Sequence, residues 1–271
     1  MVLDGDAGGT AGAVHGAARD GFRKEAQSYA RGRPEYPSEA VGWLRDALGL
    51  APGRTAVDVG AGTGKFTRLL AATGARVVAV EPIAQMREQL AQQLPGVEAV
   101  EGTAQAVPLA DGAADVLACA QAFHWFATGE ALAEFHRVLR PGGRLLLVWN
   151  VRDESVDWVA RLTGIITPHE GDAPRFHTGA WRRVFDAPDG AGRRLFRPLE
   201  VTRWPHAHVG TPQQVIVDRV MSVSFIAALP AAENARVRAQ IEELAATHPA
   251  LRGRQEVSFP YSTLAFTAVR R

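Results

Sequence analysis

Residues 54–150 alternate short β-branched runs with helical stretches, and no other feature of the chain constrains its fold as strongly. The apolar runs predict five strands, at Thr55–Val59, Arg76–Val80, Val97–Glu101, Ala114–Cys119 and Arg144–Trp149. Helical periodicity predicts three helices between them, at Lys65–Ala72, Ile83–Leu94 and Gly129–Leu139. Strands as continuously apolar as VVAV and LLLVW are typical of burial on both faces, so the alternation predicts an α/β fold with a doubly wound parallel sheet.

The regular alternation does not extend beyond residue 150. Upstream, Ser38 is expected to be the N-cap of a helix over Glu39–Leu48. Downstream, the pattern predicts a strand over Leu199–Trp204, helices over Thr211–Val223 and Ala231–Ala246, and a final strand over Glu256–Val269. We therefore expect a flexible tail over residues 1–20, a core over 21–150, a helical insertion or lid over 151–256 with a core strand near 199–204, and a last core strand over 257–271.

The charge balance and the single cysteine narrow the possible partners. Thirty Lys and Arg residues face 29 Asp and Glu residues, which gives no reason to expect nucleic acid or an anionic membrane as a partner. No apolar run approaches the length of a membrane span, and the acidic first residues do not resemble a signal sequence, so we expect a cytoplasmic protein. Cys119 has no second sulfur beside it, and His206 and His208 share one strand face without a third ligand, so no metal is expected.

The segment VDVGAGTGKF places a glycine loop between the first predicted strand and the first helix. A P-loop for nucleoside triphosphates needs one more residue between its first and last glycines, and it needs a hydroxyl where Phe66 stands. A dinucleotide loop needs a glycine where Lys65 stands, and the Asp58 carboxylate would repel a pyrophosphate. The loop therefore favours neither of these phosphate-bearing ligands.

The same residues suit S-adenosylmethionine (SAM), which carries an ammonium group and a sulfonium but no phosphate. An acid at Asp58 attracts the cationic methionine end of SAM. Glycines at positions 60, 62 and 64 let the backbone approach a ligand without a Cβ atom in the way. The spacing D-x-G-x-G-x-G therefore indicates a SAM loop.

VDVGAGTGKF resembles motif I of the class I SAM-dependent methyltransferases, and four further segments are similar to that family. These are VVAVEP, which ends the second strand, EGTAQ after the third strand, DGAADV before the fourth and LRPGG before the fifth. YARGRPEYP, from Tyr29 to Pro37, and QAFHWF, from Gln121 to Phe126, resemble segments of the trans-aconitate-methyltransferase-like branch. The resemblance implies a Rossmann-like, mostly parallel seven-stranded sheet whose last strand is antiparallel.

The resemblance also implies a set of cofactor-binding residues. Glu81 takes the position of the acid that binds both ribose hydroxyls, and Tyr29 and Arg33 lie in the segment that covers the methionine carboxylate. Thr103 stands where the family usually has an acid beside adenine, so this contact is expected to be shared with the two residues that follow. The complete expected set is Tyr29, Arg33, Asp58, Gly60, Ala61, Gly62, Gly64, Glu81, Pro82, Thr103, Ala104, Gln105 and Gln121.

A second group of residues is expected around the methyl acceptor. His124 and Trp125 follow the fourth strand at the carboxyl edge of the sheet, where doubly wound folds bind ligands. His124 is a candidate general base, although a carboxylate acceptor would need none. His124, Trp125 and Trp181 are candidates for the wall of the acceptor pocket.

Together these features predict an enzyme that moves a methyl group from SAM to an oxygen, carbon or nitrogen of a small molecule by in-line displacement, leaving S-adenosylhomocysteine. One alternative is a SAM-binding protein that does not methylate or that uses bound SAM in another reaction, because cofactor motifs report binding and not turnover. An NAD-dependent oxidoreductase is disfavoured by the spacing at Gly64 and Lys65.

Overall fold

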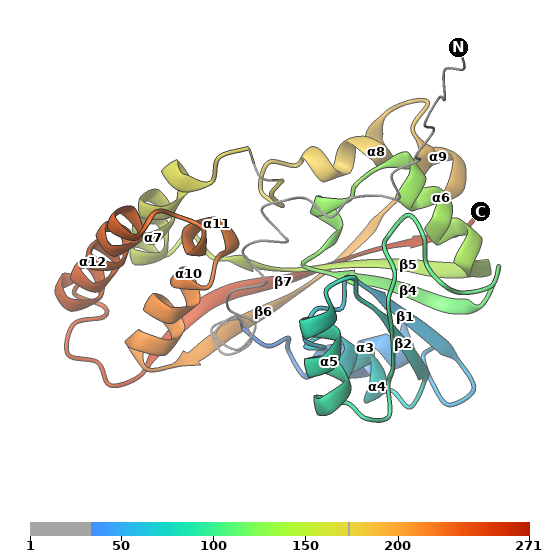
Figure 1. The fold of residues 1–271 in the computed structure, drawn as a ribbon, viewed down its shortest axis with the longest axis horizontal. Coiled ribbons are helices and arrows are strands. Elements are labelled where there is room, and N and C mark those ends of the chain that lie inside the picture. Colours follow the sequence, from blue (N-terminus) through green and yellow to red (C-terminus); the bar gives the residue numbers. More distant parts are fainter. Residues whose placement is uncertain (1–33, 173) are drawn as a thin grey trace, which may run out of the picture.

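The computed structural model of the chain describes residues 34–172 and 174–271, so the predicted tail over residues 1–20 and the candidate residues Tyr29 and Arg33 lie outside the described residues. The described residues form a seven-stranded sheet in the order β3-β2-β1-β4-β5-β7-β6 (Figure 1). The strands are β1 (Thr55–Val59), β2 (Arg76–Val80), β3 (Glu98–Val100), β4 (Ala114–Ala120), β5 (Leu139–Arg152), β6 (Glu200–Gly210) and β7 (Val257–Val269).

The sheet is parallel except at its last strand in the sequence. β1 pairs in parallel with β2 and β4, β2 with β3, and β4 with β5. β7 runs antiparallel to both of its neighbours, β5 and β6. β1 and β2 each have four consecutive buried residues, as expected for strands covered on both faces. The predicted doubly wound, mostly parallel sheet with an antiparallel last strand is confirmed.

Two strands are longer than the sequence pattern indicates. β5 continues past Trp149 to Arg152, and β6 continues past Trp204 to Gly210. The added residues of both strands pair with β7, so that Arg152 lies opposite Tyr261 and Gly210 opposite Val257. Backbone pairing therefore extends these strands beyond their apolar runs and carries the sheet out past the core.

Helices cover both faces of the sheet. α6 (Gly129–Val138), α8 (Arg183–Asp186) and α9 (Ala191–Leu195) lie on one face, where Leu132 and Phe135 of α6 are fully buried. α3 (Glu39–Asp46) and α4 (Thr67–Ala71) lie on the other, where Leu44 and Leu70 are fully buried. α5 (Ala84–Gln93) packs beside β3. The three- and four-residue spacing of these apolar side chains is the reason that each helix presents one face to the sheet.

The start of α3 differs from the expectation, because Ser38 does not cap it. Ser38 has helical backbone angles (φ −61°, ψ −29°), whereas an N-cap residue is normally extended. Its hydroxyl donates to the Glu39 carboxylate (3.3 Å) and accepts no helix amide. The carbonyl oxygen of Pro37 accepts from the Ala40 N–H instead (3.1 Å).

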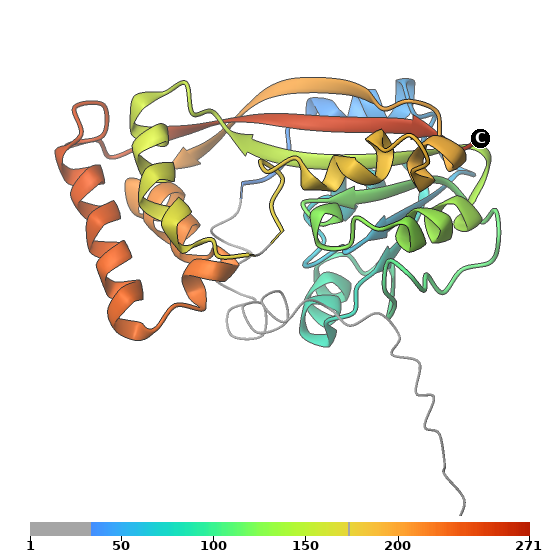
Figure 2. The same cartoon turned by 90° about the horizontal axis from the view of Figure 1, so that it is seen from above.

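A helical lid surrounds the outer ends of β5, β6 and β7 (Figures 1 and 2). Its helices are α7 (Asp157–Ile166), α10 (Arg219–Met221), α11 (Ser224–Ala227) and α12 (Ala231–Thr247), and they enclose a core of their own. The single helix predicted over Thr211–Val223 is instead a π-helix at Gln213–Asp218 followed by α10. Val215, Ile216 and Val217 are all buried there, which is not the one-faced pattern of a surface helix. In the part of the chain that the structure describes, no helix has the length and apolarity needed to cross a membrane.

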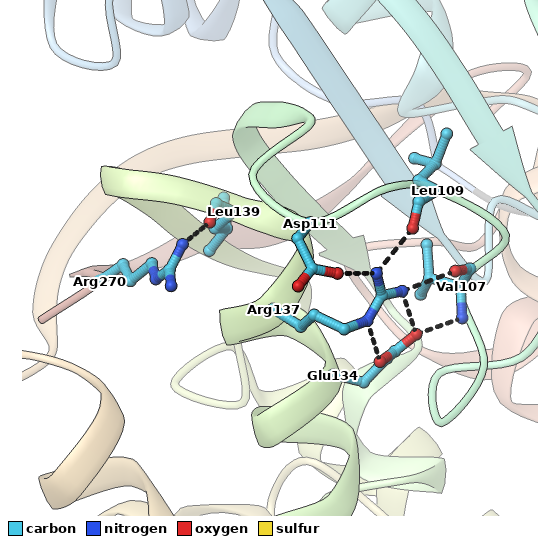
Figure 3. A network of polar contacts seen from close by, with 7 residues as sticks. All are labelled: Val107, Leu109, Asp111, Glu134, Arg137, Leu139 and Arg270. Carbon is cyan, nitrogen blue, oxygen red and sulfur yellow. Dashed lines mark hydrogen bonds and ion pairs between the residues drawn. The ribbon is translucent and has the colours of Figure 1, made fainter.

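Arg137 of α6 fixes the loop that joins β3 to β4 (Figure 3). Its guanidinium donates to the carbonyl oxygens of Val107 (3.0 Å) and Leu109 (2.8 Å) and to the Asp111 carboxylate (2.7 Å). Glu134 accepts two bonds from Arg137, both 2.8 Å long, and a third from the Val107 N–H (2.8 Å). The bonds from Arg137 hold the pKa of Glu134 below its usual value. The clamp ties the loop that carries the expected adenine contacts to α6.

Candidate active site

The glycine loop after β1 combines a special backbone conformation with one open position. Gly60, Gly62 and Gly64 have φ values of 72°, 56° and 88°, which residues with a Cβ atom rarely adopt. A Cβ atom on Gly60 would lie 2.8 Å from Ala122 Cβ. The nearest atom to a Cβ atom on Gly62 would be the Met86 sulfur, at 4.0 Å. Gly60 therefore permits close packing against the end of β4, whereas the loop is open at Gly62.

A pocket with an empty volume of about 570 Å³ lies over this loop and is here called the loop pocket. The expected cofactor residues that line it are Asp58, Gly60, Ala61, Gly62 and Gln121. Arg219 of the lid also lines it. The structure therefore brings the end of β1, the end of β4 and the lid together at one site.

Asp58 offers this pocket a buried carboxyl oxygen without a partner among the described residues. Its side chain is fully buried, and its Oδ2 accepts from the Thr67 hydroxyl (2.7 Å). Its Oδ1 is buried and has no hydrogen-bond partner among the described residues. Burial raises the pKa of Asp58 to about 7, and the nearby Glu81 charge adds to the rise. An ammonium group would satisfy both the unpaired oxygen and the charge, so Asp58 fits the amino group of SAM.

Glu81 stands at the end of β2, beside the glycine loop. Its Oε2 accepts from the Gly62 N–H (2.8 Å), and its Oε1 accepts from the Ile83 N–H (2.9 Å). Burial raises the pKa of Glu81, and these two bonds oppose the rise. A carboxylate has about four acceptor positions, so each oxygen can accept a further bond from a hydroxyl. The fixed orientation suits a ribose diol.

The described part of the YARGRPEYP segment lies over the loop pocket. Pro34 and Tyr36 line the pocket, and the Tyr36 ring meets the Phe66 ring edge-on with centroids 5.0 Å apart. Glu35 forms an ion pair with Lys65 (2.6 Å), and its carbonyl oxygen accepts from the Asn150 side-chain amide (2.9 Å). These contacts hold the segment against the loop next to the position where Arg33, outside the described residues, was expected to act.

The residues expected beside adenine form a tight turn after β3. Thr103 and Ala106 exchange two backbone hydrogen bonds (3.3 and 3.2 Å). Ala104 is buried within the turn, whereas Thr103 and Gln105 are partly exposed. The turn lies at the same carboxyl edge of the sheet as Glu81, where ligands bind in doubly wound folds. The adenine contact stays a prediction.

Gln121, directly after β4, has the only positive φ (58°) among the non-glycine residues that the structure describes. Its N–H donates to the Val148 carbonyl oxygen (2.8 Å), and its side-chain amide donates to the Asn150 carbonyl oxygen (3.3 Å). Strained backbone held in this way is often found at functional sites. Gln121 lines the loop pocket and also a second cavity beside it.

The second cavity, here called the acceptor cavity, shares Gln121 and Arg219 with the loop pocket. Its empty volume, open mouth included, is about 900 Å³. His124 and Trp125 line it, and the lid supplies the opposite wall. The two cavities therefore place a lid-covered space directly beside the expected cofactor.

Three arginines line the acceptor cavity: Arg152 at the end of β5, Arg175 in the segment after α7, and Arg219 of α10. Nε and Nη2 of Arg175, and Nε and Nη1 of Arg219, are buried without a hydrogen-bond partner among the described residues. Arg175 also stacks over the rings of Phe225 (4.4 Å) and Trp125 (5.4 Å). Burial lowers the pKa of Arg152 and of Arg175, and the Arg219 charge adds to the effect on Arg152. Buried donors without acceptors are unfavourable, so this cavity suits an anionic ligand.

The two acids of the cavity do not form ion pairs with these arginines. Glu170 pairs with His177 (3.2 Å), and Glu154 accepts from the Thr163 hydroxyl (3.1 Å). Their charges still act from a distance, because Glu170 raises the pKa of Arg152 and of Arg175, and Glu154 raises that of Arg152. Three arginines against two acids leave the cavity with an excess of positive charge.

Trp181 does not line the acceptor cavity, so the prediction that placed it there is wrong. It is only 3% exposed and packs inside the core against Trp149 (4.7 Å), Phe176 (5.8 Å) and Phe266 (5.0 Å). Trp149 and Phe176 of this aromatic cluster line the cavity, and the Nε1–H of Trp149 donates to His124 Nδ1 (3.1 Å).

His206 and His208 lie on one face of β6, as the alternation indicates. Burial lowers the pKa of both, that of His208 to about 4, and the Arg219 and Lys65 charges add to the effect on His208. No group of three or more metal-ligating side chains is found in the described part of the chain.

The three arginines of the acceptor cavity were not predicted from the sequence. Arg152 is the last residue of β5, at the carboxyl edge of the sheet, and that position could have marked it. Arg175 and Arg219 lie in segments without a regular pattern, in a chain that contains many arginines. No local signal distinguishes them.

Known proteins resemble this chain both in sequence and in fold. Residues 57–147 match a family model described as a methyltransferase domain. The chain is 40% identical over 247 residues to an uncharacterized methyltransferase of Mycobacterium tuberculosis, an alignment that covers 91% of this chain and 94% of the relative. It is 35% identical over 248 residues to an uncharacterized methyltransferase-like protein of Schizosaccharomyces pombe, again covering 91% of this chain and 94% of the relative. A proposed type II methyltransferase from Anaeromyxobacter dehalogenans superposes with a TM-score of 0.59 at 25% identity, covering 88% of this chain and 96% of that structure. The chain therefore belongs to the class I SAM-dependent methyltransferases, whose methyl donor is SAM.

Proposed function

We propose that the protein transfers the methyl group of SAM to a small acceptor that carries two or more carboxylates. The observation that carries this proposal is that Arg175 and Arg219 line one cavity and that both have buried N–H groups without a partner among the described residues. A carboxylate accepts from a guanidinium in a bidentate manner and would satisfy these donors. The resemblance of YARGRPEYP and QAFHWF to the trans-aconitate-methyltransferase-like branch supports the same acceptor class.

In this proposal the cofactor binds in the loop pocket and the acceptor binds in the acceptor cavity. Asp58 and Glu81 hold the cofactor's cationic end and its ribose, with the glycine loop between them. When bound, SAM supplies an electrophilic methyl group on a sulfonium that leaves as the neutral thioether of S-adenosylhomocysteine. Trp125 provides an aromatic wall beside the cavity. Positioning of the acceptor against the methyl group is what this arrangement contributes to the rate.

Arg219 has a special place because it lines both cavities. A carboxylate bound to Arg219 would lie where the two cavities meet, whereas Arg175 lines the acceptor cavity and not the loop pocket. An acceptor with two acidic groups can be held at both points, and its orientation is then fixed. A neutral molecule of the same shape leaves both guanidiniums unsatisfied and binds poorly.

The test is a panel of acceptors in an assay for S-adenosylhomocysteine. The panel contains aliphatic mono-, di- and tricarboxylic acids, the amides of the same skeletons, and organic phosphates. We expect turnover with di- or tricarboxylates and not with the amides. Equal turnover with charged acids and neutral amides would contradict the proposal.

Variants of the arginines give a second test. Arg175→Gln should raise the acceptor KM about 10- to 100-fold, the value of one or two hydrogen bonds to a charged group, without changing the Kd of SAM. Arg161→Gln is the matched control, because Arg161 lies on the lid helix α7 and, among the residues that the structure describes, pairs with the exposed Asp157 (3.0 Å). Calorimetry with SAM, S-adenosylhomocysteine and NAD completes the test. SAM binding without turnover of any acid in the panel would favour a SAM-binding protein that does not methylate.

A further inference from the structure

The tautomer of His124 is set by a buried tryptophan. Trp149 is 1% exposed and is fixed by ring contacts with Trp181 (4.7 Å) and Phe176 (4.8 Å). Its Nε1–H lies 3.1 Å from His124 Nδ1. An indole nitrogen can only donate, so Nδ1 of His124 must be the acceptor. In a neutral imidazole with an accepting Nδ1, the hydrogen is on Nε2.

This tautomer is unsuited to general-base catalysis. A base needs a nitrogen lone pair that can take a proton, and the only such lone pair of the ring is at Nδ1, where Trp149 already donates. Protonation of Nδ1 would set two N–H groups against each other and leave the indole N–H unpaired inside the core.

Cationic side chains lie around His124. Arg175 stacks over Trp125, whose ring centroid lies 5.3 Å from that of His124, and Arg152 and Arg219 line the same cavity. Their guanidiniums can hold an anionic acceptor beside His124. The other titratable groups that line the cavity are Glu154, Glu170 and His177, and Glu170 is paired with His177.

We propose that His124 acts as a neutral hydrogen-bond donor that orients the acceptor through Nε2–H, and that Trp149 is the positioning residue that fixes this tautomer. The proposal rests on the proposed methyl transfer to an anionic acceptor, since an oxygen of that acceptor would receive the bond. Because no proton is removed by His124, the attacking atom must enter the cavity with its lone pair free, as a carboxylate oxygen does at neutral pH. His124 is therefore assigned to orientation and not to activation of the nucleophile.

Two substitutions separate a donor from a base. Glutamine places an N–H donor near the position of Nε2 but is not a base, whereas alanine supplies neither function. We expect His124→Gln to keep kcat within about 5-fold of the wild type with a dicarboxylate or tricarboxylate acceptor, and to keep the same pH profile between pH 6 and 8.5. His124→Ala should raise the acceptor KM about 10-fold or more. If His124 were a base, both variants would lose roughly 10²- to 10⁴-fold in kcat, and this result would overturn the proposal.

A spectroscopic readout makes the test independent of the acceptor. In the full chain labelled with ¹⁵N-histidine, the long-range ¹H–¹⁵N correlation pattern distinguishes the two neutral tautomers and the imidazolium. The signal of His124 is identified by its loss in His124→Gln, with His169→Gln, in which a lid histidine is changed, as the control. We expect the Nε2–H tautomer from pH 6 to 8 in the wild type and a loss of that preference in Trp149→Phe. An imidazolium or an Nδ1–H tautomer in this range would refute the assignment, even if no carboxylic acid is methylated. Absence of turnover together with the expected tautomer would instead count against the proposed function alone.

Discussion

Asp58→Asn removes a buried charge, so it should stabilise the protein in the absence of SAM and weaken SAM binding at the same time. Burial raises the pKa of Asp58 from 3.8 to about 7. A carboxyl group whose pKa is higher in the folded than in the unfolded state destabilises the fold increasingly as the pH rises from the lower to the higher value. Asparagine keeps an oxygen that can accept the Thr67 bond (2.7 Å) but does not ionise.

The size of the effect follows from the pKa rise. One pKa unit corresponds to about 1.4 kcal/mol, so ionisation of Asp58 destabilises the folded state by about 1.5 kcal/mol at pH 5 and about 4 kcal/mol at pH 8. The new amide hydrogens of asparagine lower stability by a further amount that does not depend on pH. The informative quantity is therefore the difference in unfolding free energy between the variant and the wild type at each pH. This difference should be about 2.5 kcal/mol more favourable to the variant at pH 8 than at pH 5.

Urea unfolding of both proteins at pH 5 and pH 8, without SAM, measures this change. Asp157→Asn is the control, because Asp157 is exposed and its pKa is lowered by His248, so its substitution should show no gain at pH 8. Calorimetry at pH 8 should show SAM binding weakened about 10- to 100-fold in Asp58→Asn, as expected for the loss of a charge-assisted hydrogen bond. A stability difference that is the same at both pH values would refute the reasoning about Asp58.

Three further predictions concern single positions. Gly60→Ala places a Cβ atom 2.8 Å from Ala122 Cβ at a φ of 72°. It should therefore lower the free energy of unfolding by about 1–3 kcal/mol and abolish SAM binding in calorimetry. The control is Gly53→Ala, at a φ of 86° with open space around it, which should keep SAM binding. Arg137→Ala removes the clamp on the loop between β3 and β4 and should lower the unfolding free energy by about 2–4 kcal/mol in urea titrations; unchanged stability would show that the clamp is not needed. His208 has a pKa of about 4 in the folded state, below its unfolded value of 6.5. The stability that it contributes is therefore present above pH 6.5 and is lost as the pH falls towards 4. His208→Gln should unfold less readily on acidification over this range, which far-UV circular dichroism would detect.

Much of the fold was predictable because its signals are local. β1 and β2 begin and end where their apolar runs do, since turns or glycines bound those runs. The lengths of β5 and β6 were not predictable, because their outer residues join the sheet through pairing with β7, which is far away in the sequence. The helix predicted over Thr211–Val223 became a π-helix and a short α-helix for a similar reason, since its residues pack between the sheet and α12.

The sequence by itself determined the class of cofactor. Asp58 and the glycines after it lie within a few residues of each other, so one loop holds the groups that select SAM over phosphate-bearing ligands. The spacing of these residues is therefore visible in the sequence itself.

Only the tertiary structure decided what the acceptor cavity is like. Arg152, Arg175 and Arg219 come from separate segments, and they share one cavity because the lid folds over the end of β5. Trp149 likewise reaches His124 only because β5 pairs with β4 in a particular register. The sequence shows no pattern for a charge that comes from separate segments or for a tautomer that a neighbouring strand sets. The contacts that create both form only when the chain has folded.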